Sequence, residues 1–181
     1  MTGTPEIRVL FDEEVIATRV REVATAISQD NPTRLLIVAV LKGSFIFAAD
    51  LARALHRVGS VPEMEFLHLS SYGSGTVSSG EVKVLRDIES DVTERDVILV
   101  DDILESGRTL KFARDMIASR GAKSVRIAAL LDKPKDRQAD IEADYKGFDC
   151  PDKFVVGYGM DMGHAWRQLP FIGYVPQEGD E

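Results

Sequence analysis

The regular alternation of short apolar runs with helix-length segments constrains the fold of this chain more than any other feature. The runs "RLLIVAVL" (34–41), "DVILVDD" (96–102) and "SVRIAALLD" (124–132) have the length and largely apolar character of strands covered on both faces. Apolar residues at helical spacing occupy three further segments, 13–27, 44–55 and 109–121. Strands interleaved with helices of ten or more residues predict an α/β fold, in which a twisted, mostly parallel sheet is flanked by helices.

The remaining patterns are consistent with one domain over residues 1–181. Weaker or shorter strand patterns lie at 64–72, 81–88, 153–159 and 171–175. Asp12 stands in the N-cap position of the first helical segment, and Gly121 closes the last one at a C-cap position. The chain has no internal repeat, and its 181 residues are enough to bury a proper core.

The composition excludes several classes of protein. The longest apolar stretch, residues 35–41, is far too short to span a bilayer, and the N-terminus lacks the pattern of a signal peptide. A single cysteine, Cys150, rules out an internal disulfide framework and fits a reducing compartment. The 30 acidic residues exceed the 22 basic ones, which disfavours nucleic acid as a partner but not a small phosphorylated substrate. We therefore expect a cytoplasmic protein with no membrane or nucleic-acid partner.

The segment "VILVDDILESGRTL" (97–110) places two adjacent carboxylates at the end of a predicted buried strand. Asp101 and Asp102 in this position can accept hydrogen bonds from a vicinal diol or hold Mg²⁺. The turn after them opens a helix, where backbone N–H groups and the hydroxyls of Ser106 and Thr109 form a cradle for a phosphate. Gly107 permits close approach of the backbone. The alternative is an ordinary capped turn with solvated acids.

This segment resembles the phosphoribosyl-pyrophosphate motif of the type I phosphoribosyltransferases. The resemblance implies that Asp101 and Asp102 contact the ribose hydroxyls, and that the following loop holds the 5′-phosphate. The loop residues are Glu105, Ser106, Gly107, Arg108 and Thr109. Relatives usually carry aspartate where Glu105 stands, as the proposed base toward the purine, so the resemblance makes Glu105 the catalytic residue.

Two further segments fit the same family. "LKGS" (41–44) resembles its pyrophosphate-binding loop, which implies a role for Lys42 and Gly43 and a cis peptide before Lys42; read alone, it is a simple helix entry. The Gly- and Ser-rich segment 69–82 resembles the mobile lid of hypoxanthine-guanine phosphoribosyltransferases, with Ser71 and Tyr72 as lid residues. By composition alone, that segment is equally a surface hairpin. A lid excludes water from an oxocarbenium-like transition state.

The last third of the chain resembles the C-terminal signature of bacterial hypoxanthine phosphoribosyltransferases. "LLDKP" supplies Lys133, whose donor-only ammonium favours the 6-oxo group of hypoxanthine or guanine over the amino group of adenine. In "PDKFVVGYGMD", Phe154 would stack on the base and the backbone of Val155 would bind its edge. Asp161, with Asp101 and Asp102, would hold Mg²⁺, and Arg167 would meet the pyrophosphate. Without the resemblance, this segment reads as a core strand followed by an acidic residue, Asp161, in a turn.

Taken together, the resemblance implies a transferase with a core over about 10–135 and a small hood from the terminal segments, mainly about 145–176. It would move the phosphoribosyl group of phosphoribosyl pyrophosphate to N9 of hypoxanthine or guanine, with Mg²⁺ as cofactor. Relatives form dimers or tetramers, so we expect a homodimer or a homotetramer.

Three alternatives remain open at this point. Pyrimidine-operon attenuators share the fold and have a loop close to "VDDILESGRT", so the chain is alternatively an RNA-binding regulator. A second alternative is a transferase that prefers xanthine. In the third alternative, the change from aspartate to Glu105 has abolished catalysis, and the chain only senses nucleotides.

Overall fold

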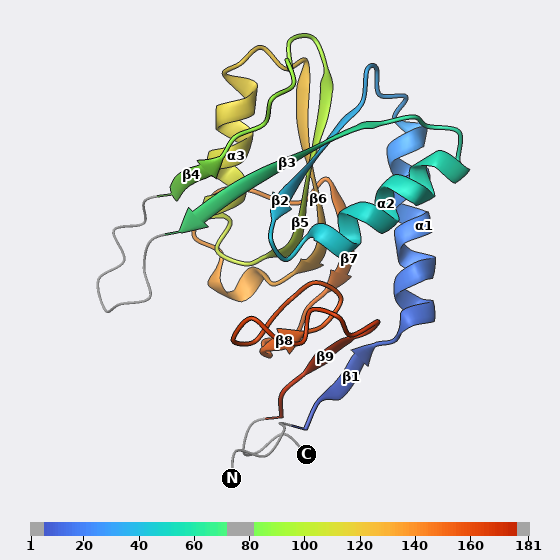
Figure 1. The fold of residues 1–181 in the computed structure, drawn as a ribbon, viewed down its shortest axis with the longest axis vertical. Coiled ribbons are helices and arrows are strands. Elements are labelled where there is room, and N and C mark those ends of the chain that lie inside the picture. The colour runs from blue at the N-terminus through green and yellow to red at the C-terminus, as the bar shows by residue number, and fades with distance from the viewer. Residues whose placement is uncertain (1–5, 72–81, 177–181) are drawn as a thin grey trace.

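The computed structural model describes residues 6–71 and 82–176, which form a six-stranded sheet, a three-stranded sheet and the flanking helices (Figure 1). Neighbouring strands of the large sheet are parallel except β3 and β4, which are antiparallel. This arrangement confirms the predicted fold class. The strand order is β4 (Val82–Arg86), β3 (Glu63–Ser71), β2 (Leu36–Leu41), β5 (Asp96–Leu104), β6 (Ser124–Asp132) and β7 (Tyr145–Asp149).

Helices cover both faces of the large sheet (Figure 1). Helices α1 (Glu13–Gln29) and α2 (Phe45–Arg57) pack on one face, and α3 (Arg108–Ala118) packs on the other. Each face therefore has its own apolar core, which explains why the central strands are apolar at successive positions. Asp12 is the N-cap of α1, as predicted, because its Oδ1 accepts the N–H of Val15 at 2.9 Å.

The smaller sheet combines the two ends of the described chain. Strand β9 (Ile172–Tyr174) pairs with β1 (Arg8–Phe11) on one side and with β8 (Val155–Val156) on the other. This sheet lies beyond the carboxyl ends of the large sheet's parallel strands (Figure 1). It differs from the expected hood in one respect, because β7 belongs to the large sheet and the C-terminal share of the small sheet begins only at Val155.

Several elements differ from the sequence patterns. The strand expected at 153–159 is paired only over β8, since Gly157 and Gly159 turn the chain with φ values of +93° and +105°. β5 continues past the two aspartates as far as Leu104. β1 and β7 were not predicted, because strands of four or five residues carry little periodic signal.

A short 3-10 helix, η1 (Pro134–Asp136), connects β6 to the segment before β7. No helix among the described residues is long and apolar enough to cross a membrane.

Candidate active site

The strand order creates a crevice between β2 and β5. From β2 the chain continues to β3 on one side, whereas β5 and its successors lie on the other side. Ligands of such sheets bind outside the carboxyl ends of the strands at this switch point. Lys42 follows β2 directly, and the turn at Glu105 and Ser106 follows β5. The topology thus brings two of the motifs singled out in the sequence to one place.

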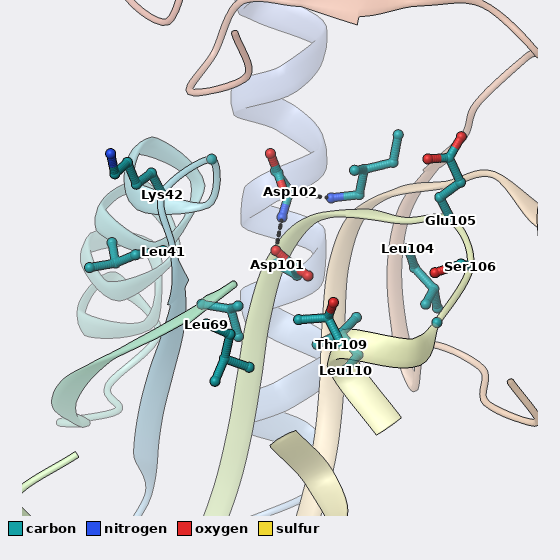
Figure 2. Close-up of a pocket in the computed structure, with 14 residues that line it drawn as sticks. Leu41, Lys42, Leu69, Asp101, Asp102, Leu104, Glu105, Ser106, Thr109 and Leu110 are labelled. Atoms are coloured by element: carbon teal, nitrogen blue, oxygen red, sulfur yellow. Dashed lines mark hydrogen bonds between the residues drawn. The ribbon is translucent and has the colours of Figure 1, made fainter. Parts of the chain in front are cut away.

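A cavity of about 250 Å³ occupies this crevice (Figure 2). Figure 2 shows Lys42 on one side of the two aspartates and Glu105 on the other. Arg108 is exposed on the first turn of α3 and does not line this cavity. The lining residues are Val40, Leu41, Lys42, Gly43, Leu69, Asp101, Asp102, Ile103, Leu104, Glu105, Ser106, Gly107, Thr109 and Leu110.

Asp101 and Asp102 form a pair of adjacent acids that lines this cavity. The Asp102 N–H donates to Asp101 Oδ1, and the Ile103 N–H donates to Asp102 Oδ1, both at 3.0 Å. Burial raises the pKa of Asp101, and the neighbouring charge of Asp102 raises it further. Burial also raises the pKa of Asp102, although these hydrogen bonds oppose that shift. The pair is therefore suited to a ligand that brings a cation or hydrogen-bond donors.

Gly43 makes room for this acid pair. A Cβ at Gly43 would lie 1.7 Å from Asp102 Oδ2, so no side chain fits there. The Leu41–Lys42 peptide before it is cis, as the family resemblance implies. Ser44, which is buried, donates from its hydroxyl to the carbonyl of Val40 at 2.6 Å and ties the loop back to β2.

The turn after β5 leads directly into α3. Gly107 is the N-cap residue of α3 and has φ +78°, a conformation that favours glycine. A Cβ there would lie 2.5 Å from the side chain of Ile141. The N-terminus of this eleven-residue helix opens toward the cavity at Thr109, so its N–H groups and helix dipole favour an anion there.

A second cavity of about 200 Å³ adjoins the first and shares Asp102, Ile103 and Glu105 with it. Its remaining walls come from Lys133 and from the loop that carries β8. Phe154 is 50% exposed there, whereas Val155 is buried. The complete lining is Asp102, Ile103, Glu105, Lys133, Lys153, Phe154, Val155, Met160 and Asp161.

Lys133 lines the second cavity, where it pairs with Glu105, a residue that lines both cavities. Its Nζ lies 2.8 Å from Glu105 Oε1 and 3.6 Å from Asp152 Oδ1, and its side chain is only 13% exposed. The hydrogen bond to Glu105, together with the two nearby negative charges, raises the pKa of Lys133. The ammonium is therefore firmly protonated and acts only as a donor.

Asp161 and Arg167 form an ion pair, with 2.6 Å between Arg167 Nη2 and Asp161 Oδ1. The second carboxylate oxygen of Asp161 accepts the His164 N–H at 2.8 Å. Arg167 also donates from Nη1 to the carbonyl of Gly159 at 2.7 Å. Arg167 lines neither cavity, and its guanidinium is committed to the loop that carries Asp161.

Sequence reasoning missed several residues at the site. Lys153 and Met160 line the second cavity beside the predicted Phe154. Gly159 touches the loop after β2, since a Cβ there would lie 2.1 Å from the carbonyl oxygen of Gly43. The glycines of "VVGYGMD" were the available signal for such a close approach.

The proposed lid falls largely outside the described residues. Ser71 ends β3 and pairs with Val82 through its backbone. Tyr72 and the Gly- and Ser-rich residues that follow it lie outside the part of the chain that the structure describes.

Comparison with known proteins identifies the family. Residues 9–162 match the family profile described as "Phosphoribosyl transferase domain". The chain is 45% identical over 175 residues to hypoxanthine-guanine phosphoribosyltransferase of Streptococcus thermophilus, which covers 94% of each chain. It is 44% identical over 167 residues to the enzyme of that name in Bacillus subtilis, covering 92% of this chain and 91% of the other. A crystal structure of a Bacillus anthracis hypoxanthine-guanine phosphoribosyltransferase superposes with a TM-score of 0.88 at 42% identity, covering 94% of this chain and all of the other. The chain therefore belongs to the phosphoribosyltransferase domain family and, within it, to the hypoxanthine-guanine phosphoribosyltransferases.

Proposed function

We propose that this chain transfers the 5-phosphoribosyl group from phosphoribosyl pyrophosphate to N9 of a 6-oxopurine, hypoxanthine or guanine. One observation carries the proposal: the two cavities meet at Asp102, Ile103 and Glu105. The first is lined by an acid pair and a helix N-terminus, and the second by a lysine and an aromatic ring. A sugar phosphate and a flat base therefore find adjoining sites, with a carboxylate between them.

The first cavity is the site we assign to the phosphoribosyl donor. Asp101 and Asp102 would accept hydrogen bonds from the ribose hydroxyls, since ionised carboxylates are acceptors only. The N–H groups and hydroxyls of Ser106, Gly107 and Thr109 would hold the 5′-phosphate at the N-terminus of α3. The pyrophosphate would lie at Lys42 and Gly43, on the other side of the acid pair.

Two arginines, Arg167 and Arg108, were also expected from the sequence to contact the phosphoribosyl donor. Arg167 is 2.6 Å from Asp161 and would reach the pyrophosphate only by giving up part of that pair. The side chain of Arg108 is exposed and lines neither cavity, although the residue belongs to the turn proposed for the 5′-phosphate.

The second cavity is the site we assign to the purine. Lys133 would donate to the 6-oxo group, which selects hypoxanthine or guanine because adenine presents a donor there. Phe154, half exposed at the cavity, would stack on the base, and the backbone of Val155 would meet its edge. Ser71 and Tyr72 would belong to a lid that excludes water from the reacting atoms.

Mg²⁺ is the cofactor we propose, and the residues present fit it. No cluster of three or more His, Cys, Asp or Glu able to hold a metal occurs in residues 6–71 and 82–176. Mg²⁺ usually needs only one or two carboxylates together with substrate phosphates. Asp161, and the pair Asp101 and Asp102, are the carboxylates available for this. When bound, the ion would neutralise the charge of the departing pyrophosphate.

Glu105 is the residue we propose as the base. In the transfer, N9 of the purine forms a bond to C1 of the ribose as the bond from C1 to pyrophosphate breaks. The proton that the purine loses goes to the Glu105 carboxylate. General-base contributions are typically about 10²–10⁴-fold, so positioning and leaving-group electrostatics supply most of the remaining acceleration.

Pyrophosphate release from phosphoribosyl pyrophosphate with Mg²⁺ tests this function, with hypoxanthine, guanine, xanthine, adenine and uracil supplied in turn. We expect turnover with hypoxanthine and guanine and none with adenine or uracil. A preference for xanthine would change the substrate but not the reaction. Donor binding without turnover would contradict the proposal. Filter binding of leader RNA would then identify a regulator, and activity restored by Glu105→Asp would identify a nucleotide-sensing remnant.

We propose in addition that the protein acts in the cytoplasm as a homodimer or homotetramer. The oligomeric state rests on the family resemblance, and the cytoplasmic location rests on the single cysteine and the composition of the sequence. Sedimentation velocity at micromolar concentration measures the oligomer, and a monomer would contradict the second statement.

A further inference from the structure

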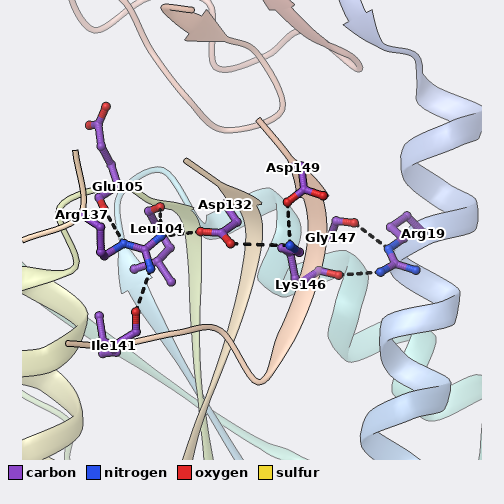
Figure 3. Close-up of polar contacts among 9 residues, drawn as sticks. All are labelled: Arg19, Leu104, Glu105, Asp132, Arg137, Ile141, Lys146, Gly147 and Asp149. Carbon is purple, nitrogen blue, oxygen red and sulfur yellow. Dashed lines mark hydrogen bonds and ion pairs between the residues drawn. The ribbon is translucent and has the colours of Figure 1, made fainter. Parts of the chain in front are cut away.

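The guanidinium of Arg137 donates hydrogen bonds to the backbone at the end of β5 and in the turn that follows it. Its Nε donates to the carbonyl of Glu105 at 2.7 Å, and its Nη2 donates to the carbonyl of Leu104 at 3.0 Å (Figure 3). Nη1 donates to the carbonyl of Ile141 at 2.7 Å. The guanidinium also pairs with Asp132, which neutralises its charge. One side chain, 17% exposed, thus engages three backbone carbonyls and a carboxylate.

The segment after Arg137 completes this support. The carbonyl of Ser106 accepts the N–H groups of Gln138 and Ala139, both at 3.0 Å. The side chain of Ile141 packs beneath Gly107, where an added Cβ would lie only 2.5 Å from it. The carbonyls of three successive residues, 104–106, therefore all accept hydrogen bonds from residues 137–139, and the carbonyl of Leu104 also accepts the N–H of Lys133 at 3.0 Å.

This support determines which way the turn presents its N–H groups. Arg137, Gln138 and Ala139 do not line the first cavity, so the carbonyls they hold point away from it. In a trans peptide unit the C=O and the N–H point in opposite directions. The N–H groups of Glu105, Ser106 and Gly107 are consequently turned toward the cavity. Successive N–H groups arranged in this way form an anion site.

We propose that Arg137 is a positioning residue for the 5′-phosphate of the donor: it sets phosphate affinity by orienting the 104–107 turn without touching the substrate. The inference rests on the proposed function. Arginine suits the role because its planar fork carries five donors in fixed directions, whereas lysine carries three at a single point.

Arg19 provides a matched control within the same chain. It also donates to two backbone carbonyls, from Nε to Gly147 at 2.6 Å and from Nη2 to Lys146 at 2.8 Å (Figure 3). Its Nη1 pairs with Glu22 at 2.6 Å. Arg19 thus makes the same kinds of contact as Arg137, but these contacts support β7 and not the turn after β5. An arginine that only stabilises the fold should behave like Arg19.

The test compares Arg137→Gln, Arg137→Lys and Arg19→Gln with the wild type. Isothermal titration with ribose 5-phosphate, which carries the phosphate but no pyrophosphate, measures the affinity directly. Steady-state kinetics give the KM for phosphoribosyl pyrophosphate and for hypoxanthine separately, and thermal unfolding gives Tm. Groups that orient the ligands of a metal ion are typically worth about 10–100-fold in affinity, and we expect the same scale for a group that orients the phosphate-binding turn. We therefore expect Arg137→Gln to weaken ribose 5-phosphate binding and raise the donor KM by about that factor, with a smaller loss in Arg137→Lys.

These measurements distinguish a positioning role of Arg137 from a role in fold stability alone. We expect the hypoxanthine KM of the Arg137 variants to stay close to the wild-type value, and Arg19→Gln to lower Tm without changing either KM. If Arg137→Gln lowers Tm but leaves ribose 5-phosphate affinity unchanged, the residue is merely structural and the proposal is overturned. Should Arg137→Gln fail to fold, Arg137→Lys decides by the same criterion. Absence of donor binding and turnover in the wild type would instead overturn the proposed function together with this inference.

Discussion

Lys133 and Glu105 form an ion pair in the wall of the second cavity, with 2.8 Å between Lys133 Nζ and Glu105 Oε1. The lysine assigned to the purine and the carboxylate assigned as the base thus neutralise each other in the absence of substrate. The ammonium has three donors, so a 6-oxo group could accept from Lys133 while Glu105 stays paired with it. Purine binding would then place the ring next to the carboxylate assigned as the base.

Replacing the carboxylate tests its role as base. Glu105→Gln keeps the size of the side chain and its contact with Lys133 but removes the proton acceptor. We expect kcat to fall by about 10²–10⁴-fold with little change in the KM for phosphoribosyl pyrophosphate. Steady-state kinetics with hypoxanthine measure both. The control is Asp152→Asn, on the other side of Lys133 at 3.6 Å, which should leave kcat nearly unchanged. Equal losses in the two variants would contradict the assignment.

Removing the ammonium tests the purine site. Lys133→Met keeps the aliphatic stem and removes the donor to the 6-oxo group. Hydrogen bonds to charged groups contribute about 1.5–3 kcal/mol, so we expect the hypoxanthine KM to rise by about 10–150-fold. The donor KM should change far less. The matched control is Lys135→Met, because Lys135 also pairs with Asp152 but is 66% exposed and lines neither cavity. A similar rise in both variants would refute the specific role of Lys133.

Gly43 allows a prediction based on steric fit alone. In Gly43→Ala the new Cβ would meet Asp102 Oδ2 at 1.7 Å, so the Asp102 side chain must move. We expect a large loss of kcat/KM for the donor while the far-ultraviolet circular dichroism spectrum stays that of the wild type. In Gly59→Ala the Cβ meets open space, but φ is +88°. That control should lose about 1 kcal/mol of stability and no activity. Full activity of Gly43→Ala would show that the position of Asp102 does not matter.

The sequence alone was sufficient to predict the strands whose residues form continuous apolar runs. Strands β2, β5 and β6 are buried on both faces, so their apolar runs identify them without tertiary information. β7 is an edge strand with the sequence "YKGFD", and its charged residues and Gly147 weaken any strand signal. Gly147 is required there by a contact with β6, since a Cβ would lie 2.2 Å from the carbonyl oxygen of Leu130.

The site was predictable where its residues are neighbours in the chain and less so where folding brings them together. Asp101 and Asp102 follow one another, and the turn after them carries its own glycine, so one segment of sequence contains most of the first cavity. The pairing of Glu105 with Lys133 depends on the alignment of β5 with β6 and is visible only in the structure. The contacts of Arg137 depend on a segment without periodicity, and nothing in its sequence singles that arginine out.

The last prediction concerns stability at the amino end of the sheet, away from the site. Asp96, at the start of β5, accepts hydrogen bonds from the Thr33 N–H at 2.6 Å, the Thr33 hydroxyl at 2.9 Å and the Ser124 hydroxyl at 2.6 Å. Lys123 lies 3.3 Å from the same carboxylate. Burial alone would raise the pKa of Asp96, but the hydrogen bonds from Ser124 and Thr33 outweigh it and hold the pKa well below its usual range.

A carboxyl group whose pKa is lower in the folded state stabilises that state above its unfolded pKa, about 3.9 for aspartate, and this contribution is lost as the pH falls through the folded pKa. We expect Asp96→Asn to lower the free energy of unfolding by about 1.5–3 kcal/mol at pH 7, because a charged acceptor is lost. The difference from the wild type should shrink as the pH falls below about 4, since asparagine does not titrate. Urea unfolding at a series of pH values measures it. The control Asp115→Asn breaks only the exposed pairs with Lys111 and Arg114 and should cost about 0.5 kcal/mol or less. A difference for Asp96→Asn that stays constant down to low pH would mean that the shape of the side chain, and not its charge, holds Asp96 to Thr33 and Ser124.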